Sequence, residues 1–178
     1  MAAADSCDGI STSGGGWEKT VTLVSSDDAR FEVREAAASL SQTVRRMIDE
    51  AGGRAGGDGG IPLPKVDART LSTVLEYCNK HAAVPAPARE SSSAEAAAVD
   101  LEWFDKELMH VDLATLCSLI RAADYLEVAG LLDLTCKTVA DMIKSKTAEE
   151  IRQMFGIQND FTPEEEEQLS RENAGVFE

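Results

Sequence analysis

Alternating apolar and polar residues predict a β-hairpin near the start of the chain. Val21 and Leu23 alternate with threonines, and residues 31–34 (Phe-Glu-Val-Arg) repeat the pattern. This period of two is typical of half-buried strands, and the Ser-Ser-Asp-Asp sequence at 25–28 has the chemistry of a turn between them. The Ile-Pro-Leu-Pro sequence at 61–64 contains too much proline for a central strand, so we expect an edge strand there.

Apolar residues at helical spacing follow in three segments. Ser39 and Gln42 have the spacing of a capping box and predict the start of one helix. Asp67 and Asp112 are expected N-caps of two later helices. The apolar positions match a helix with one buried face. The three stripes expected to be buried are Leu40, Val44, Met47 and Ile48; Leu71, Val74, Leu75 and Cys78; and Leu113, Leu116, Cys117 and Ile120.

The last third of the chain is predicted to be entirely helical. Gly130 marks an expected break, after which another apolar face begins. Thr147 with Glu150, and Thr162 with Glu165, have capping-box spacing and predict the starts of two further helices. The apolar face after the break consists of Leu132, Cys136, Val139 and Ile143.

Composition divides the chain into ordered and disordered segments. Residues 1–16 are rich in Ala, Ser and Gly and are expected to be disordered, as are insertions at about 52–60 and 82–99. The strands all precede the helical half. We therefore predict an α/β (α+β) domain over residues 17–126 and a helical region over 127–178.

The charge of the chain narrows its possible partners. The 178 residues include 17 Lys and Arg but 32 Asp and Glu, a formal net charge of −15 at pH 7. Nucleic-acid binders neutralise phosphates with basic side chains, so this balance argues against nucleic acid and against an anionic membrane. No apolar run approaches the ~20 residues that span a bilayer, and we expect no secretory signal. The four cysteines are therefore expected to be reduced.

Candidate catalytic groups are few. A Cys–His hydrolase would need a reactive thiol beside His81 or His110, but Cys117 and Cys136 lie on predicted apolar faces, where a thiol behaves as a small hydrophobe. No pair of ligands has zinc-finger spacing. The glutamates at 164–167 point in different directions around a helix and match the positive end of its dipole. We therefore expect no enzyme activity, no metal site and no cofactor.

The back half presents more apolar helical surface than its short helices can bury against one another. These residues either complete a core shared with the front half or form a docking face for another protein's helices. Periodicity alone does not distinguish the two interpretations. The residues are Leu131, Leu132, Leu134, Val139, Met142, Ile143, Ile151, Met154, Phe155, Ile157 and Phe161.

Short segments from Val21 to the end of the chain match the pattern of one protein family. In the front half they are Leu-Val-Ser-Ser-Asp-Asp at 23–28, Phe-Glu-Val at 31–33, Ser-Gln-Thr-Val at 41–44, Pro-Leu-Pro at 62–64 and Glu-Tyr-Cys-Asn-Lys-His at 76–81. In the back half they lie at 131–143, 146–152, 157–167 and 171–173. On these segments the chain resembles the S-phase kinase-associated adaptor family, whose members link cullin to F-box proteins in SCF ubiquitin ligases. Its alanine-rich termini resemble plant members.

The resemblance implies a BTB/POZ-like domain followed by C-terminal helices that bind the F-box. It also implies a non-catalytic adaptor subunit of an SCF (cullin–RING) ligase in the nucleus and cytoplasm, with F-box proteins and a cullin scaffold as partners. The cullin-binding residues carried over are Asp124 and Tyr125. The expected F-box-binding residues are Leu116, Ile120, Leu132, Val139, Ile143, Ile157, Phe161 and Val176.

The chain departs from the family pattern at three places. Asp124 adds a negative charge where the family has a neutral amide, and Gly175 stands where the family has an F-box-contacting Trp. Losing a buried interface Trp can cost ~2 kcal/mol or more of binding free energy. Trp103 lies one residue earlier than the family's Trp, which directly precedes the Asp. The alternative function, a BTB/POZ oligomerisation module outside ubiquitination, leaves the helical tail after Gly130 unexplained.

Overall fold

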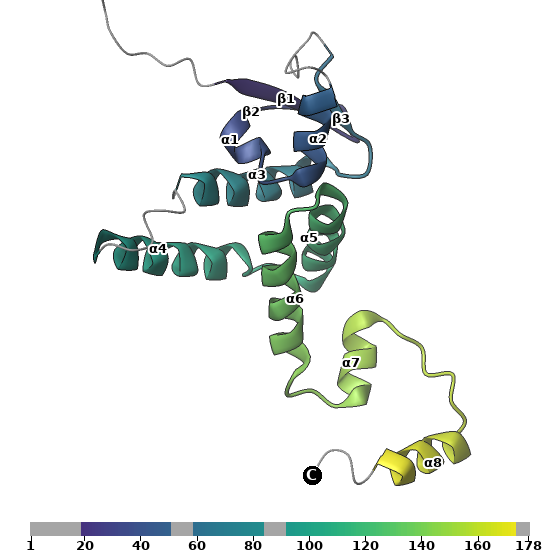
Figure 1. Cartoon of the computed structure of the whole chain (residues 1–178). Helices are drawn as coiled ribbons and strands as arrows, with labels where there is room; N and C mark the ends of the chain where they lie inside the picture. The colour runs from purple at the N-terminus through teal and green to yellow at the C-terminus, as the bar shows by residue number, and fades with distance from the viewer. Residues whose placement is uncertain (1–18, 51–58, 84–91, 174–178) are drawn as a thin grey trace, which may run out of the picture. The chain divides into compact units, whose positions relative to one another are not determined.

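The computed structural model describes residues 19–50, 59–83 and 92–173 of the chain (Figure 1). The disorder expected at 1–16 and over most of 52–60 lies outside these residues. Statements below about what the structure contains refer to the described residues.

Two compact units make up the chain, residues 1–136 and 137–178. The division falls within one helix, later in the chain than the domain boundary expected after residue 126. That boundary stays a prediction. Each unit is described by itself.

The predicted hairpin is confirmed. Strand β1 (Thr20–Ser25) pairs antiparallel with β2 (Arg30–Arg34), and Val21 lies opposite Val33. Strand β3 (Ile61–Leu63) pairs in parallel with β1 on its other side, so the sheet order is β2-β1-β3. The proline-rich segment is therefore an edge strand, as expected, because proline cannot donate to a second neighbour.

The other regular elements of the described chain are helices, with α1 and α2 blue and the later helices running from teal through green to yellow in Figure 1. Helix α3 packs against α1, α4 and α5, and α2 packs against α5. The helices are α1 (Glu35–Ala38), α2 (Gln42–Glu50), α3 (Ala68–Ala82), α4 (Ser92–Leu108), α5 (Leu113–Leu126), α6 (Ala129–Ile143), α7 (Ala148–Phe155) and α8 (Pro163–Asn173).

Four predicted helix starts are confirmed. Asp67 and Asp112 each accept the backbone N–H of the residue three positions later, at 3.0 and 3.1 Å. Thr147 and Thr162 form capping boxes with the glutamates three positions later. These starts were predictable because a cap is a contact between residues close in sequence.

The start predicted for α2 was wrong. Ser39 ends α1, where its hydroxyl donates to the carbonyl of Glu35 at 2.7 Å. The cap of α2 is Ser41, whose Oγ accepts the N–H of Val44 at 3.1 Å. The four-residue helix before it was not foreseen, and Leu40, expected in the buried stripe, is exposed between the two helices.

Gly130 does not break the chain, contrary to prediction. It lies in the first turn of α6, and the break falls at Glu127, whose φ of 52° is left-handed and ends α5. The glycine is required for another reason. A Cβ at position 130 would lie 2.5 Å from the hydroxyl oxygen of Tyr77 on α3.

The disorder expected at 82–99 was also wrong in part, because α4 begins at Ser92. Residues 92–99 are rich in alanine, which has the highest helix propensity. They form one continuous helix with residues 100–108. Helix α4 is tied to α3 by an ion pair of Lys80 with Asp100 at 3.0 Å and by a hydrogen bond between the His81 Nε2 and an Asp105 carboxylate oxygen at 2.8 Å.

The core of the first unit confirms the predicted α3 stripe, since Leu71, Val74, Leu75 and Cys78 are all buried. The α5 stripe was misplaced. Its buried face consists of Leu116, Leu119, Ala122, Ala123 and Leu126, whereas Leu113, Cys117 and Ile120 are half-buried. The reason is that α5 packs against both α2 and α3, which together cover a different face from the one that periodicity selects.

We expect Asp67→Ala to lower the free energy of unfolding by about 0.5–2 kcal/mol, nearer the lower value because the carboxylate is exposed and screened. Hydrogen bonds from the Thr70 N–H and hydroxyl hold the pKa of Asp67 below its usual 3.8. The stabilisation is therefore fully present above pH ~4 and is lost as the pH falls through the lower, folded-state pKa. Urea unfolding of wild type and variant at neutral and acid pH measures this; an unchanged difference at low pH would contradict it.

Candidate functional site

The apolar side chains of the second unit have no core of their own to enter. None of residues 137–172 is fully buried, and α7 contains no buried residue. Ile157 is 56% exposed and Phe161 is 48% exposed. Exposed apolar clusters of this kind mark surfaces that bind other proteins. Of the two interpretations left open by the sequence, this burial favours a docking face.

Three of the expected F-box-binding residues share one face of α6. Leu132, Val139 and Ile143 follow the helical period, and all three are half-buried. Leu131 and Thr135, in the first half of the same helix, are completely buried. Thr135 is three residues after Leu132 and four before Val139, so it shares their face, and the burial of this face decreases toward the C-terminal end of α6.

Polar contacts fix the connection between α7 and α8 that carries Ile157 and Phe161. Glu166 on α8 pairs with Arg152 on α7 at 3.3 Å, and it accepts the Asn159 side-chain amide at 2.7 Å. The Asn159 Oδ1 in turn accepts the N–H of Phe161 at 3.3 Å, the turn contact expected of this residue type. These contacts hold in place the segment that carries the exposed side chains of Ile157 and Phe161.

The remaining expected F-box residues differ in their surroundings. Leu116 is completely buried in the first unit, and Ile120, one turn later on α5, is half-buried. Val176 lies outside the described residues. A direct contact of Leu116 with a partner stays a prediction, and its burial favours a supporting role beneath the surface.

The two expected cullin-binding residues lie at the end of α5. Tyr125 is half-buried and Asp124 is exposed. The carbonyl oxygen of Tyr125 accepts the Thr43 hydroxyl at 3.1 Å, and the next carbonyl, of Leu126, accepts the Ser41 hydroxyl. These bonds from the start of α2 fix the backbone that presents both side chains.

A small cavity that sequence analysis missed lies beside Tyr125. Its volume is about 270 Å³, and its walls include Lys65 before α3 and Arg121 on α5. The Lys65 Nζ lies 5.2 Å from the centroid of the Tyr125 ring. The two cations are far apart in sequence, and no local motif joins them, so only the packing of α5 against α3 could reveal their proximity.

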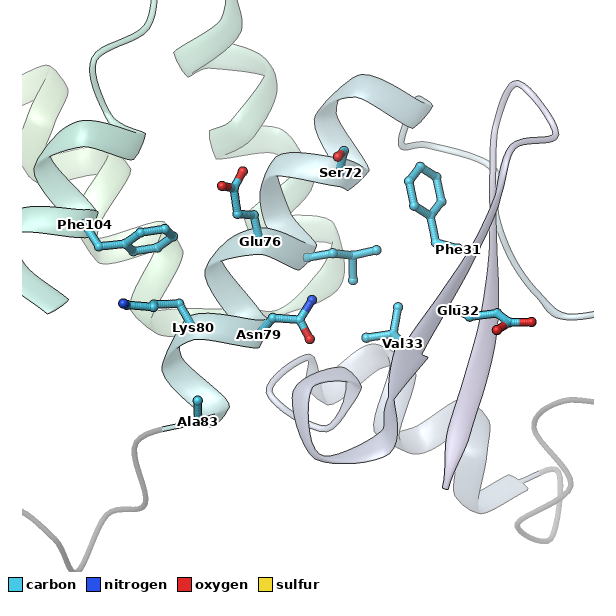
Figure 2. A pocket seen from close by; sticks show the side chains of 10 residues that line it. Phe31, Glu32, Val33, Ser72, Glu76, Asn79, Lys80, Ala83 and Phe104 are labelled. Carbon is cyan, nitrogen blue, oxygen red and sulfur yellow. The ribbon is translucent and has the colours of Figure 1, made fainter. Parts of the chain in front are cut away.

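A larger cavity of about 570 Å³ lies between β2, α3 and α4. Figure 2 shows Lys80 beside the Phe104 ring, whose centroid lies 5.6 Å from its Nζ. Phe104, which directly precedes Asp105 where the family pattern has Trp, lines this cavity, whereas Trp103 does not line it and is 65% exposed. Asp105 contacts His81 at 2.8 Å.

The surroundings of the described thiols and of His81 bear on the Cys–His pair considered from the sequence. Cys136 is exposed and Cys117 is half-buried, so neither is the core thiol that was predicted. Cys78 is buried instead, and desolvation raises its pKa to about 12, which disfavours the reactive thiolate. His81 is not a free surface histidine, because its ring stacks on Tyr77 with centroids 3.9 Å apart and pairs with Asp105.

Within residues 19–50, 59–83 and 92–173, no group of three or more His, Cys, Asp or Glu side chains is arranged to hold a metal ion. No helix in this part of the chain combines the length and apolar character needed to cross a membrane.

Comparison with known proteins finds domain models of one family in both halves of the chain. The model of the Skp1 family tetramerisation domain matches residues 19–83, and that of the Skp1 family dimerisation domain matches residues 129–176. SKP1-like protein 1 of Oryza sativa subsp. japonica is 53% identical over 173 residues, 92% of this chain and 98% of the relative. SKP1-like protein 1A of Arabidopsis thaliana is 50% identical over 163 residues, covering 90% and 98%. SCF ubiquitin ligase complex protein SKP1a of Dictyostelium discoideum is 46% identical over 153 residues, covering 86% and 93%.

Proposed function

The chain belongs to the Skp1 family, and we propose on that premise that it is the adaptor subunit of an SCF ubiquitin ligase, joining F-box substrate receptors to a cullin scaffold. The observation that carries this proposal is the second unit, in which residues 137–172 leave every side chain at least partly accessible. An apolar surface without a core of its own is what an obligate docking region requires.

The adaptor acts by holding its partners together. Binding a substrate receptor at one surface and a cullin at another raises the effective concentration of substrate near the ubiquitin-charged enzyme. This contribution needs no catalytic residue, so the proposal is for a protein that is not itself an enzyme. The location proposed is nucleus and cytoplasm, compatible with the free thiols of Cys78, Cys117 and Cys136.

The F-box-binding residues proposed here lie on one face of α6 and in the exposed segment after α7. Leu132, Val139 and Ile143 supply one helix face, and Ile157 and Phe161 supply exposed anchors. An amphipathic helix binds such surfaces by inserting apolar anchors at i, i+3 and i+4 spacing. The family's Trp is replaced at Gly175, so we expect weaker capture of F-box proteins that rely on that anchor.

The cullin surface proposed here is centred on Tyr125. We expect Tyr125→Ala to weaken cullin binding by roughly 1–3 kcal/mol, because a half-buried aromatic at an interface is a typical anchor. F-box binding should be unchanged, since the Thr43 bond holds the backbone carbonyl and not the ring. Calorimetric titration of each partner measures the two affinities. Equal losses for both partners would show damage to the fold in place of a separate cullin surface.

The alternative function, an oligomerisation module outside ubiquitination, is less well supported. It would use the first unit, with its BTB/POZ-like sheet and helices. It gives no role to the exposed apolar residues of the second unit, such as Ile157 and Phe161. We therefore favour the adaptor.

A further inference from the structure

The cavity beside Tyr125 has the chemistry of a receptor for an acidic side chain. It lies within the first unit, with Lys65 and Val66 on one wall and Ser118, Arg121 and Tyr125 of α5 on the other. We propose that it receives an Asp or Glu side chain of the cullin-type partner, whose carboxylate lies between the ammonium of Lys65 and the guanidinium of Arg121. This inference rests on the proposed function, because it assigns the partner chemistry at the surface around Tyr125.

Both cations have capacity for a further acceptor. In the part of the chain that the structure describes, neither Lys65 nor Arg121 is in an ion pair. Arg121 makes one long hydrogen bond, from its Nη2 to the Ser118 Oγ at 3.4 Å, and a guanidinium has five N–H donors. The Lys65 ammonium is held over the Tyr125 ring. Two cations around one cavity stand out in a chain with a net charge of −15.

Nearby carboxylates limit the charge that the cavity can accept. Asp67 also lines it, but its oxygens already accept the Thr70 N–H at 3.0 Å and the Thr70 hydroxyl at 2.8 Å. Asp124 is exposed next to Tyr125 and adds a further negative charge. A singly charged carboxylate suits this balance better than a phosphate dianion does.

The cavity also has an apolar part, which favours a side chain over a free ion. Val66 and Ala122 are buried residues of its wall, and the Tyr125 ring covers another part. These groups can pack against the methylene groups of Asp or Glu while the carboxylate meets Lys65 and Arg121. A small inorganic anion would leave this apolar surface wet. Because Tyr125 lines the cavity, the side chain that enters it should belong to the protein that binds at Tyr125.

The test uses the full chain and a cullin N-terminal region, with affinity measured at low and high salt. The double variant Lys65→Met/Arg121→Met should bind cullin roughly tenfold more weakly at low salt and lose most of the salt dependence, because charge pairs are screened by ions. A matched control, Lys106→Met/Lys146→Met, removes the same charge from exposed sites elsewhere and should stay close to wild type. F-box affinity should be unchanged in both variants.

A charge exchange gives the sharper result. Lys65→Glu/Arg121→Glu should bind cullin still more weakly, and replacing one acidic residue of the cullin surface by Lys should restore binding to this variant alone. Wild-type affinity in the Lys65→Met/Arg121→Met variant, with cullin still bound, would overturn this inference and leave the adaptor function standing. Absence of cullin binding by the wild-type chain would overturn both. Saturable binding of inorganic phosphate or acetate at the cavity, without any effect of the variants on cullin, would indicate a free-anion site instead.

Discussion

Replacing Ile157 by glutamate should abolish F-box capture while leaving the melting temperature of the free chain nearly unchanged. Ile157 is 56% exposed, so a charged side chain remains solvated in the free protein. In a complex the same charge would be buried without a partner, which costs several kcal/mol and weakens binding on the order of a hundredfold or more. Ile143→Glu applies the same test to α6, with some loss of stability because Ile143 is half-buried.

The matched control for this experiment is Val99→Glu. Val99 is also an exposed β-branched residue, 67% accessible, but it lies on helix α4 in the first unit, whereas Ile157 follows α7. We expect it to keep wild-type F-box affinity. A large fall in melting temperature for Ile157→Glu, with cullin binding lost as well, would place Ile157 in the adaptor's own core and contradict the docking surface.

Leu116→Ala should lower the free energy of unfolding by about 2–5 kcal/mol, because it removes a completely buried side chain and leaves a cavity. A domain of this size has a total stability of only about 5–15 kcal/mol, so the loss is a large fraction of the whole. Both partners should then bind less well at elevated temperature, in proportion to the fraction unfolded. Urea unfolding followed by circular dichroism measures the change.

Ile120→Ala is the comparison for Leu116. The two residues are one turn apart on α5, but Ile120 is half-buried and loses less packing on truncation. If Ile120 contacts the F-box, its variant should lose F-box affinity with a smaller loss of stability. Unchanged stability in Leu116→Ala together with lost F-box binding would instead show that Leu116 touches the partner directly.

Features set by residues close in sequence could be predicted from the sequence. The hairpin follows from alternation and turn chemistry, and the caps at Asp67, Asp112, Thr147 and Thr162 follow from donor and acceptor spacing of three residues. Each depends on the local chain alone, so no tertiary contact can override it easily. The apolar stripe of α3 was also predictable, because its residues follow the helical period.

Features set by distant contacts could not be predicted. Glycine commonly ends helices, so Gly130 predicts a break, but it lies within α6, where a Cβ would come 2.5 Å from the Tyr77 hydroxyl oxygen on another helix. The buried face of α5 was misplaced because two helices cover it. The cavity lined by Lys65 and Arg121 had no sequence signal, because only the packing of the folded chain brings these two residues to the same cavity. Periodicity marked Leu132, Val139, Ile143, Ile157 and Phe161 as excess apolar surface without distinguishing a docking face from a core. Their assignment to the F-box, and that of Asp124 and Tyr125 to cullin, came from family resemblance.

The most direct test of the adaptor function is assembly of a three-component complex. An F-box protein is immobilised, and a cullin N-terminal region is passed over it with and without this chain. The account predicts that cullin is retained only when the chain is present, that Ile157→Glu prevents retention by breaking the F-box contact, and that Tyr125→Ala reduces retention by weakening the cullin contact. Retention of cullin without the chain, or a chain that binds one partner only in the absence of the other, would contradict it.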